Sequence, residues 1–563
     1  MSAKQAPITV PEGFTLHTEN TSHILLPDTK EAFLNPVQEF NRDLSVAAIR
    51  TWSEEFNKMK EEKWRKTLER KGRKGEKATK RAKAGDPAGG TATSELLFVG
   101  EQTSDAGRQA EYRPYQFVLL EALSATGLRS IRYAKEIPLV KYVIANDLSS
   151  LATAAMKRNV ELNDLGITSS DAEARIESSS KENAGKVRIN EGDARALMYA
   201  HSLENARVDV VDLDPYGTAA PFIDSAVQCI NDGGLLCVTC TDLSVLATNN
   251  YPEKCYSNYG GIPVKAEYSH EVALRLVLHS ISTSAARYGR YIEPVLSLSI
   301  DFYVRLFVKV HTAPIEVKKA ASKTSIYYVC SGCQSYYGQP LGKVVEKVHE
   351  RTGNTNLLFK THTGPTVPER CPECESSLHL AGPMWNAAIH DPTFIGGVLE
   401  HLEANEEKYG TASRMKGMLT VAKEELDAPF YFTPSRIASF FHCQCPSLDQ
   451  VASALLHAGH KISRSHAAPG SLKTSATRKD VHSIFRSWVK QNPVKMEKIS
   501  ETSPARALLA KAPEFEANFA RHSDTVTPSS KVKLVRYQVN PTPNWGPGTK
   551  AQSGTKRKRE GDE

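Results

Sequence analysis

The stretch FVLLEALSATG, residues 117–127, is an apolar run that ends in an acidic residue and a turn of small residues. Four similar runs follow at intervals filled by helix-like sequence: YVIANDL (142–148), KVRINEGD (186–193), VDVVDLD (208–214) and GLLCVTCT (234–241). Continuous β-branched runs are typical of strands buried on both faces of a parallel sheet, with the helices as crossovers. We therefore predict a doubly wound, Rossmann-like α/β sheet. The last run, PVLSLSIDFYVRLFVKV (294–310), has no helix-sized gap and predicts an antiparallel hairpin at the sheet edge.

The bulk composition indicates a folded protein of several domains. With 563 residues the chain is long enough for two or three domains, and its net charge of +7 suits a polyanionic partner without requiring one. Ten cysteines are too few for a disulfide framework, so we expect a reducing compartment. Because no signal segment or long apolar run is evident, we expect a soluble, non-secreted protein without membrane contact.

Shifts in composition divide the chain into six predicted segments. The basic low-complexity stretch has few core residues, so we read it as an exposed insertion that is a solvated loop, an RNA contact or a nuclear-localisation element. The order is an N-terminal arm with strands and the start of a helix (1–57), the basic insertion (58–93), the sheet domain (94–312), a cysteine-bearing insert (313–384), a smaller mostly helical α+β domain (385–503) and a mostly disordered basic tail (504–563).

Acidic residues stand at three successive strand ends, where open α/β sheets bind ligands. Glu121 begins Glu121–Gly127, which resembles the acidic-x-x-x-Gly-x-Gly signature of class I methyltransferases, with Ala125 in place of the first glycine. Asp147 follows Glu121 by 26 positions, near the spacing at which dinucleotide folds present a carboxylate to ribose hydroxyls. Asp193 follows the third strand, and the resemblance to class I methyltransferases implies that an acid at this point accepts a hydrogen bond from the adenine amine. A tight turn and a helix N-cap are the structural alternatives.

The fourth strand ends in Asp212-Leu-Asp-Pro-Tyr-Gly217, a candidate reacting site. Its second half resembles the Asp/Asn-Pro-Pro-Tyr/Phe motif of methyltransferases that act on exocyclic amines of nucleobases. We predict that the Asp214 carboxylate accepts an N–H from the amine, that the Pro215 region offers a carbonyl, and that Tyr216 stacks on the base. A β-turn after a strand would explain Pro215 to Gly217 but not the two flanking carboxylates.

Taken with these motifs, the segments Asn35–Ser45 and Ala122–Arg132 resemble the tRNA guanine-26 N2-dimethyltransferases, over about Asn35 to Lys490. The resemblance implies a class I methyltransferase domain with a family-specific C-terminal domain. It also implies transfer of two methyl groups from S-adenosylmethionine to guanine N2 in tRNA. The cofactor contacts that it implies come from Arg42, Arg129, Asp147, Asp193 and Ala194. The residues alone leave Arg42 and Arg129 open as surface residues, and leave open whether Arg129 or Arg132 points inward.

Two Cys-x-x-Cys pairs, Cys330/Cys333 and Cys371/Cys374, predict a closed structural zinc knuckle, with four unpaired thiols as the alternative. The sequence Arg464–Thr474 with Arg478 and Lys479 could close a winged-helix-like RNA surface, or form a solvated loop.

Two other functions compete with tRNA methylation. One is methylation of an exocyclic amine in another RNA or DNA base, and the other is a tRNA-binding or folding factor without chemistry. We expect tRNA as the partner, with no obligate protein partner evident. We expect the nucleus as the location, with the mitochondrion as a second compartment. The basic cluster Lys556–Arg559 is ambiguous in the same way as the basic insertion.

Overall fold

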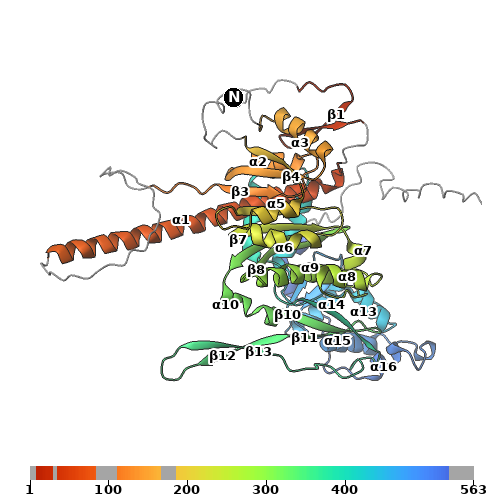
Figure 1. The fold of residues 1–563 in the computed structure, drawn as a ribbon. Coiled ribbons are helices and arrows are strands. Elements are labelled where there is room, and N and C mark those ends of the chain that lie inside the picture. The colour runs from red at the N-terminus through yellow and green to blue at the C-terminus, as the bar shows by residue number, and fades with distance from the viewer. Residues whose placement is uncertain (1–7, 29–33, 84–110, 167–184, 532–563) are drawn as a thin grey trace, which may run out of the picture.

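The computed structural model of the chain describes residues 8–28, 34–83, 111–166 and 185–531, with side chains in the first long helix only as far as Arg70. A seven-stranded sheet forms its centre (Figure 1), in the order β5-β4-β3-β6-β7-β9-β8. The strands are β3 (Phe117–Glu121), β4 (Val140–Asp147), β5 (Val187–Glu191), β6 (Val208–Leu213), β7 (Ile230–Cys240), β8 (Arg290–Ile300) and β9 (Tyr303–Thr312).

The strand directions confirm the predicted α/β sheet and its antiparallel hairpin. The strands from β5 to β7 are parallel, β9 runs antiparallel to β7, and β8 pairs antiparallel with β9. Strand β3 lies between β4 and β6, so the chain changes direction across the sheet at β3. Open α/β sheets bind ligands at such a switch point, outside the carboxyl ends of the strands.

Helices cover both faces of this sheet. One face packs against α1 (Glu39–Lys83), α2 (Leu128–Glu136) and α3 (Ser150–Leu162), in a core that includes Trp52, Leu119 and Phe307. The other packs against α5 (Ala194–Ala200), α6 (Ala220–Cys229) and α9 (Ser269–Ala286), and the short helices α7 (Leu243–Leu246) and α8 (Pro252–Tyr259) flank α9. Both faces are therefore buried, as the continuous apolar runs predict.

The N-terminal arm begins with a hairpin of β1 (Phe14–Glu19) and β2 (Ser22–Pro27) that is tied to α3. The backbone N–H of Leu25 donates to the side chain of Asn159 at 2.9 Å, and that of His23 donates to Asn163 at 3.1 Å. These hydrogen bonds attach the N-terminal arm to the sheet domain.

The basic insertion is helical from its start, because α1 continues without a break to Lys83 and projects beyond the sheet (Figure 1). The reading of the basic insertion as a solvated loop is therefore wrong for residues 58–83. Residues 84–93 lie outside the described residues. Lysine, arginine and glutamate are good helix formers, and i,i+4 pairs such as Arg65–Glu61 (2.6 Å) support an exposed helix that has no core to bury.

The cysteine-bearing insert adds a small sheet in the order β11-β10-β14 beside α9. A separate ribbon of β12 and β13 projects from it (Figure 1). The bounds are α10 (Pro314–Val317), β10 (Thr324–Cys330), β11 (Tyr336–Pro340), β12 (Gly342–Val348), β13 (Thr355–Thr361) and β14 (Leu378–Trp385).

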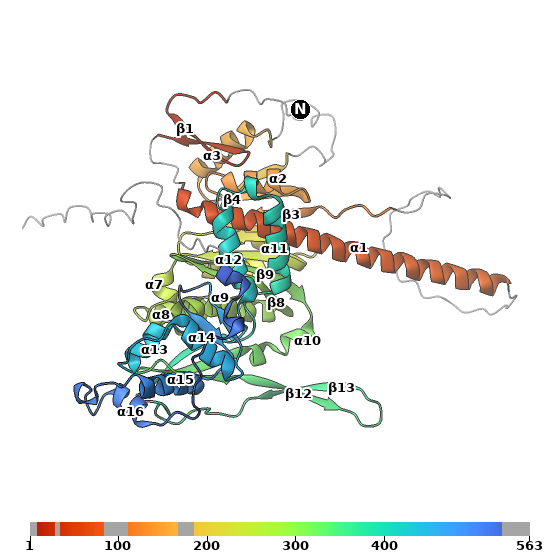
Figure 2. The same cartoon turned by 180° about the vertical axis from the view of Figure 1, so that it is seen from behind.

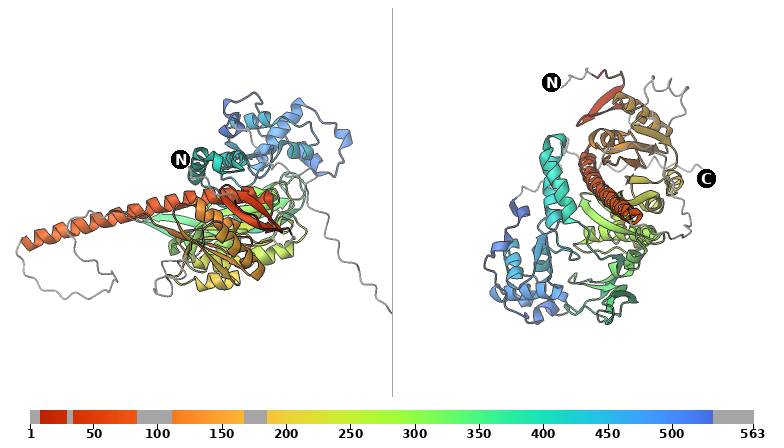
Figure 3. Two further views of the ribbon diagram at one scale, coloured as in Figure 1. Left: turned by 90° about the horizontal axis from the view of Figure 1, so that it is seen from above. Right: turned by 90° about the vertical axis from the view of Figure 1, so that its left-hand side faces the viewer.

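The predicted C-terminal domain divides between two cores. Helices α11 (Pro392–Ala404) and α12 (Ala412–Glu424) pack against α1 and share the core of the large sheet (Figure 2). The remainder forms an α+β unit that lies with the cysteine insert at the end of the molecule away from α2 and α3 (Figure 3). This unit comprises α13 (Pro434–Phe440), α14 (Leu448–His457), β15 (Ile462–Arg464), β16 (Leu472–Thr474) and α15 (Arg478–Gln491).

The folded region continues past residue 504, where we expected a disordered tail. Helix α16 (Pro504–Ala510) buries Leu508 in the core of the α+β unit, and α17 (Pro528–Lys531) follows. The polar, Pro-rich composition hid this extension because only a few apolar side chains anchor it. Residues 532–563, including Lys556–Arg559, lie outside the described residues. Within the described parts of the chain, no helix combines the length and apolarity that crossing a membrane requires.

Candidate active site and cysteine cluster

A cavity of about 430 Å³ opens at the carboxyl ends of β3, β4 and β6, beside the start of α1. Its size suits a cofactor or small ligand. It brings together six of the residues predicted from the sequence: Arg42, Arg129, Asp147, Asp214, Pro215 and Tyr216. The lining also includes Asn35, Gln38, Glu121, Ser124, Ala125, Thr126, Phe222 and Thr241.

The turn between β3 and α2 forms one wall of the cavity. Ala125 and Gly127 both have positive φ, 45° and 77°, a conformation that favours small residues. A Cβ on Gly127 would also lie 3.0 Å from the side chain of Met156 in α3. The small residues of this segment are therefore required by the backbone, whether or not a ligand is bound.

Asp147 at the end of β4 fixes this turn from the neighbouring strand. One carboxylate oxygen accepts the N–H of Ala125 at 3.0 Å, and the other accepts the N–H of Ser149 at 2.9 Å. Ser149, not Asp147, is the N-cap of α3. Each carboxylate oxygen keeps a lone pair for a further donor in the cavity.

Asp193 and Ala194 do not line this cavity. Asp193 is the N-cap of α5 and accepts the N–H of Arg195 at 2.7 Å, while its other oxygen pairs with the Arg195 guanidinium at 2.8 Å. Strand β5, which precedes them, lies directly beside β4. The structure thus places these two residues next to the cavity, at the adjacent strand end.

Asp214 follows directly after β6 and lines the cavity, and its two carboxylate oxygens have different partners. The buried guanidinium of Arg129 pairs with its Oδ2. Its Oδ1 has only a long contact, 3.5 Å, from the amide of Asn41. Arg129 therefore fixes the carboxylate and leaves one oxygen with spare acceptor capacity.

Asp212 is completely buried and forms an ion pair with Arg129. Its oxygens accept hydrogen bonds from Arg305 at 2.7 Å and from the Tyr133 hydroxyl at 2.5 Å. Burial by itself would raise its pKa, but the guanidinium groups of Arg305 and Arg129 lower the pKa of Asp212. The motif therefore contains one carboxylate that faces the cavity and one that is structural.

Arg305 was not among the residues predicted for the site. Its guanidinium also donates to the Ser45 hydroxyl at 2.8 Å, which in turn contacts Arg129 at 3.1 Å. The sequence held a signal for it, because Arg305 is the lone cation between apolar residues in YVRLFV. A charge in a buried strand is rarely found without a partner.

Glu121 belongs to the same cluster of charged side chains as Arg129, Arg305, Asp212 and Asp214. Its carboxyl is buried, 3.7 Å from the Arg129 Nε, and accepts a hydrogen bond from Ser130. Burial raises the pKa of Glu121 to about 8. A neutral Glu121 leaves two guanidinium groups, Arg129 and Arg305, facing two carboxylates, Asp212 and Asp214, so the cluster is balanced in charge.

Arg42 reaches the cavity from α1 while paired with Glu19 of the N-terminal hairpin. Its Nε lies 2.8 Å from Glu19 Oε2, and its Nη1 has a 3.4 Å contact with the carbonyl of Asn35. Arg132 also pairs with Glu19, at 3.1 Å, but does not line the cavity. Of the two arginines between which the sequence left the choice open, Arg129 is the one that faces the cavity.

The turn after Asp214 presents an aromatic ring to solvent. Tyr216 is 80% exposed although it lines the cavity. The next residue, Gly217, has a φ of 90° and exchanges two 2.8 Å hydrogen bonds with Thr241, one through the threonine hydroxyl and one through its backbone N–H. The turn is therefore held from the neighbouring β7 strand while its tyrosine stays available for stacking.

The four paired cysteines come together in the insert, all buried. Their sulfur atoms lie within 4.8 Å of one another, with 3.3 Å between Cys330 and Cys374 and 3.7 Å between Cys333 and Cys371. Tetrahedral thiolates 2.3 Å from a zinc ion would lie about 3.8 Å apart. The cluster thus has the composition and the spacing of a closed zinc site.

Comparisons with known proteins point to one family. A sequence model of the family described as N2,N2-dimethylguanosine tRNA methyltransferase matches residues 13–486. The tRNA (guanine(26)-N(2))-dimethyltransferase of Schizosaccharomyces pombe is 43% identical, covering 95% of this chain and 92% of its own. The human protein of the same name is 41% identical, covering 96% and 78%. A Saccharomyces cerevisiae protein, named as the mitochondrial enzyme, is also 41% identical, covering 95% and 92%.

A solved structure has the same fold. It is the complex of Trm1 from Pyrococcus horikoshii with S-adenosyl-L-methionine, which superposes with a TM-score of 0.59 at 23% identity and covers 83% of this chain and 98% of its own.

Proposed function

The chain belongs to the N2,N2-dimethylguanosine tRNA methyltransferase family, and from this premise we propose how its residues carry out the reaction. The enzyme methylates the exocyclic N2 of guanine 26 in tRNA. One observation carries the assignment of the reacting site. Asp214, at the end of β6, is fixed by Arg129 on one oxygen, presents the other to the cavity and is followed by Pro215 and the exposed Tyr216.

The methyl donor is S-adenosylmethionine, which supplies an electrophilic methyl group on a sulfonium. The carboxylate of Asp147 accepts hydrogen bonds from the ribose hydroxyls, since its two oxygens are already oriented by backbone N–H groups. Arg42 binds the carboxylate of the methionine moiety through Nη1, because Nε and Nη2 are engaged by Glu19. Asp193 and Ala194 contact the adenine from the end of β5, beside Asp147.

Asp214 and Tyr216 hold the guanine. The exocyclic amine is a poor nucleophile because its lone pair is delocalised into the ring. Oδ1 of Asp214 accepts one N–H of the amine and the carbonyl of Pro215 accepts the other, so that the lone pair points at the methyl group. As the N–C bond forms, the S–C bond of the donor would break and S-adenosylhomocysteine would leave as the neutral thioether. The carboxylate stabilises the positive charge that develops on nitrogen, and the nitrogen then loses one proton to solvent. Tyr216 stacks on the base, and its exposure leaves room for a nucleotide extracted from the tRNA.

Arg129 is a positioning residue in this scheme, although the resemblance implied a cofactor contact. Its guanidinium is buried, with one hydrogen bond to Ser45 and an ion pair with Asp214. Because it touches both the cavity and Asp214, it keeps the carboxylate oriented through two successive transfers.

The cysteine cluster binds one structural zinc ion. Four buried thiols lie within 4.8 Å of one another, and four sulfur ligands would leave no open position for catalysis. The α+β unit of α13 to α15, with its winged-helix-like hairpin, contacts the tRNA backbone. For location we propose the nucleus together with the mitochondrion, the compartment printed in the name of the Saccharomyces relative.

The test of this function uses unmodified tRNA and methyl-labelled S-adenosylmethionine, followed by identification of the nucleosides. We expect label in N2-methylguanosine and N2,N2-dimethylguanosine, and none when guanine 26 is replaced by adenine. Label in methylated adenine or cytosine would favour the alternative of another exocyclic amine. Binding of tRNA without any transfer would favour the non-catalytic factor.

A further inference from the structure

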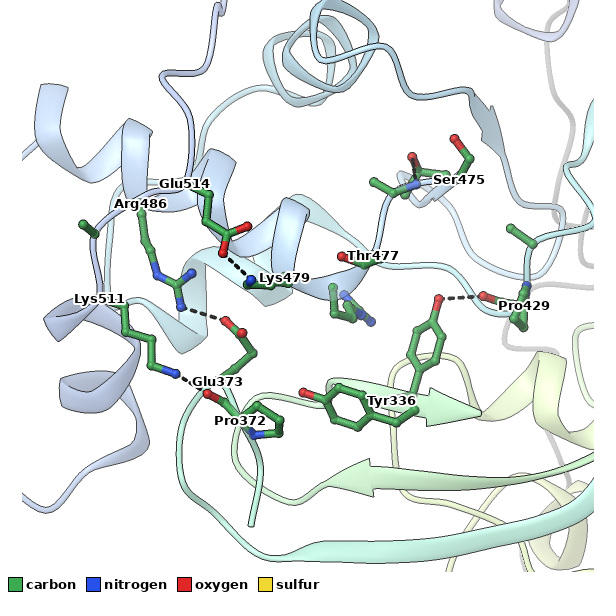
Figure 4. A pocket seen from close by; sticks show the side chains of 16 residues that line it. Tyr336, Pro372, Glu373, Pro429, Ser475, Thr477, Lys479, Arg486, Lys511 and Glu514 are labelled. Carbon is green, nitrogen blue, oxygen red and sulfur yellow. Dashed lines mark hydrogen bonds and ion pairs between the residues drawn. The ribbon is translucent and has the colours of Figure 1, made fainter. Parts of the chain in front are cut away.

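A second cavity, of about 790 Å³, lies between the cysteine insert and the α+β unit (Figure 4). Its walls come from β11, from the Cys-x-x-Cys turn at Pro372 and Glu373, from the loop before α15 and from the chain after α16. None of its lining residues belongs to the active-site cavity. A ligand bound here would therefore be separate from the methyl donor and from the reacting guanine.

The first residue of α15, Arg478, lines this cavity and has hydrogen-bond donors without partners. Its side chain is only 4% exposed, and its Nε and Nη1 have no hydrogen-bond partner among the described residues. Its Nη2 reaches Glu267 only at 3.4 Å. Buried guanidinium donors without partners are costly, so the geometry calls for an acceptor that the chain itself does not supply.

The surroundings of Arg478 favour an anion. The residue begins a 14-residue helix, whose dipole favours negative charge. The side chain of Thr477 already accepts the third N–H of this helix, that of Asp480, so the N–H groups of Arg478 and Lys479 are the ones left for an anion. Lys479, Arg486 and Lys511 add three cations to the walls, against the two carboxylates of Glu373 and Glu514. Figure 4 shows these groups around the cavity: Lys479 with Glu514, Arg486 with Glu373, and Lys511 with the carbonyl of Pro372.

Aromatic rings complete the site. Arg478 lies over the rings of Phe432, Tyr336 and Tyr268, at 5.4, 5.5 and 5.8 Å from their centroids. Tyr336 is held in place by a 2.7 Å hydrogen bond to the Pro429 carbonyl (Figure 4). Tyr337, on the same strand, is half-buried and also lines the cavity. A phosphate-binding cation beside an aromatic face is the combination by which proteins hold unstacked nucleotides of RNA.

We propose that this cavity binds a nucleotide of the tRNA substrate other than guanine 26, with its phosphate at Arg478 and the first turn of α15 and its base against Tyr337. This inference rests on the proposed function, which makes tRNA the polyanion that the enzyme meets. The volume accommodates a single unstacked nucleotide, and the excess of basic over acidic side chains matches a phosphodiester. The second site would anchor the tRNA at a distance from the reacting guanine.

The first test is charge reversal at the rim, because replacing the buried Arg478 would also remove its ion pair with Glu267 and disturb the packing around it. Lys479 is 57% exposed and paired with Glu514. Lys416 is the matched control, since it is 41% exposed, is paired with Glu403 at 3.2 Å and lies on α12 outside this cavity. We expect Lys479→Glu to weaken binding of unmodified tRNA about 5- to 10-fold. The slope of the logarithm of the binding constant against the logarithm of the salt concentration should become shallower by about 1. Glu514→Gln should tighten binding, and Lys416→Glu should change neither quantity.

A second test locates the nucleotide. A photoreactive benzoylphenylalanine in place of Tyr337 should crosslink to one position of the tRNA other than 26, read as a stop in reverse transcription. Equal effects of Lys479→Glu and Lys416→Glu would overturn the proposal, as would a crosslink to guanine 26 or to no nucleotide. Displacement of the tRNA crosslink by 1 mM adenosine monophosphate or guanosine monophosphate would assign the cavity to a free nucleotide and also overturn it. If the wild-type enzyme methylated no guanine, the proposed function would fail instead.

Discussion

Replacing Glu121 with glutamine tests whether the charge cluster under the active site is balanced by a neutral carboxyl. Burial raises the pKa of Glu121 to about 8, whereas the same group in the unfolded chain titrates near 4.5. Between these values the folded protein holds a proton that the unfolded chain has lost. The stabilisation from this group is therefore complete below about pH 4.5 and is lost as pH rises through 8.

The size of the effect follows from the shift. At about 1.4 kcal/mol per pH unit, the free energy of unfolding should lose at most about 5 kcal/mol between pH 4.5 and 8 through this one group. Glutamine has nearly the same shape and does not titrate. We therefore expect Glu121→Gln to match the wild type near pH 5 and to exceed it in stability by about 2 to 4 kcal/mol at pH 8.

The assay is urea unfolding of the two proteins side by side at pH 5, 6, 7 and 8. Glu191→Gln serves as the control, because Glu191 is exposed at the end of β5, two strands away from β3 in the sheet. For that pair the difference in stability should stay constant with pH. If the curves of Glu121→Gln and the wild type ran parallel from pH 5 to 8, a neutral Glu121 would be excluded, and so would the charge balance argued for the cluster.

Further predictions concern zinc, the long helix and the cofactor. Cys371→Ser should remove zinc, measured by elemental analysis, and lower the thermal midpoint while leaving turnover per folded molecule largely intact, because the thiolates supply folding energy; a stable but catalytically dead variant would contradict this. Replacing residues 67–105 by a flexible linker should leave S-adenosylmethionine affinity unchanged in calorimetry, since the contacts of Lys60 with Tyr115 and of Trp64 with Tyr112 lie outside the replaced segment; weaker binding would mean that the segment orders against the sheet. Asp147→Ala should weaken S-adenosylmethionine binding at least about 10-fold, as expected when a charged acceptor of two hydroxyls is lost; unchanged affinity would remove Asp147 from the cofactor site.

The sequence predicted the features that depend on local pattern. The five parallel strands and the edge hairpin followed from apolar runs. Asp147 and Asp214 followed from polar groups at strand ends, whereas Arg42 and Arg129 came from the family resemblance alone. Each Cys-x-x-Cys pair likewise placed two cysteines of the cluster without knowledge of the fold. In all three cases the spacing along the chain determines the spacing in the structure.

Other features depend on partners far apart in the sequence. The pairing of Arg42 with Glu19 and of Arg305 with Asp212 joins segments that no local pattern links. The helix through 58–83 was missed because its composition lacks a buried face, although its residues favour helix. The order of 504–531 was missed for a similar reason, since Leu508 is the one fully buried side chain of α16.

Single-turnover methylation by Asp214 variants tests the account of the active site most directly. With tRNA and S-adenosylmethionine both saturating, Asp214→Ala should transfer methyl about 10²- to 10³-fold more slowly than the wild type, the usual cost of losing one preorganised electrostatic partner. Its affinity for S-adenosylmethionine should remain near normal, because the acids assigned to the cofactor are Asp147 and Asp193. Asp214→Asn keeps an acceptor oxygen and loses the charge, so its rate should lie between the two. Transfer by Asp214→Ala at the wild-type rate would contradict the assignment of this carboxylate to the reacting amine.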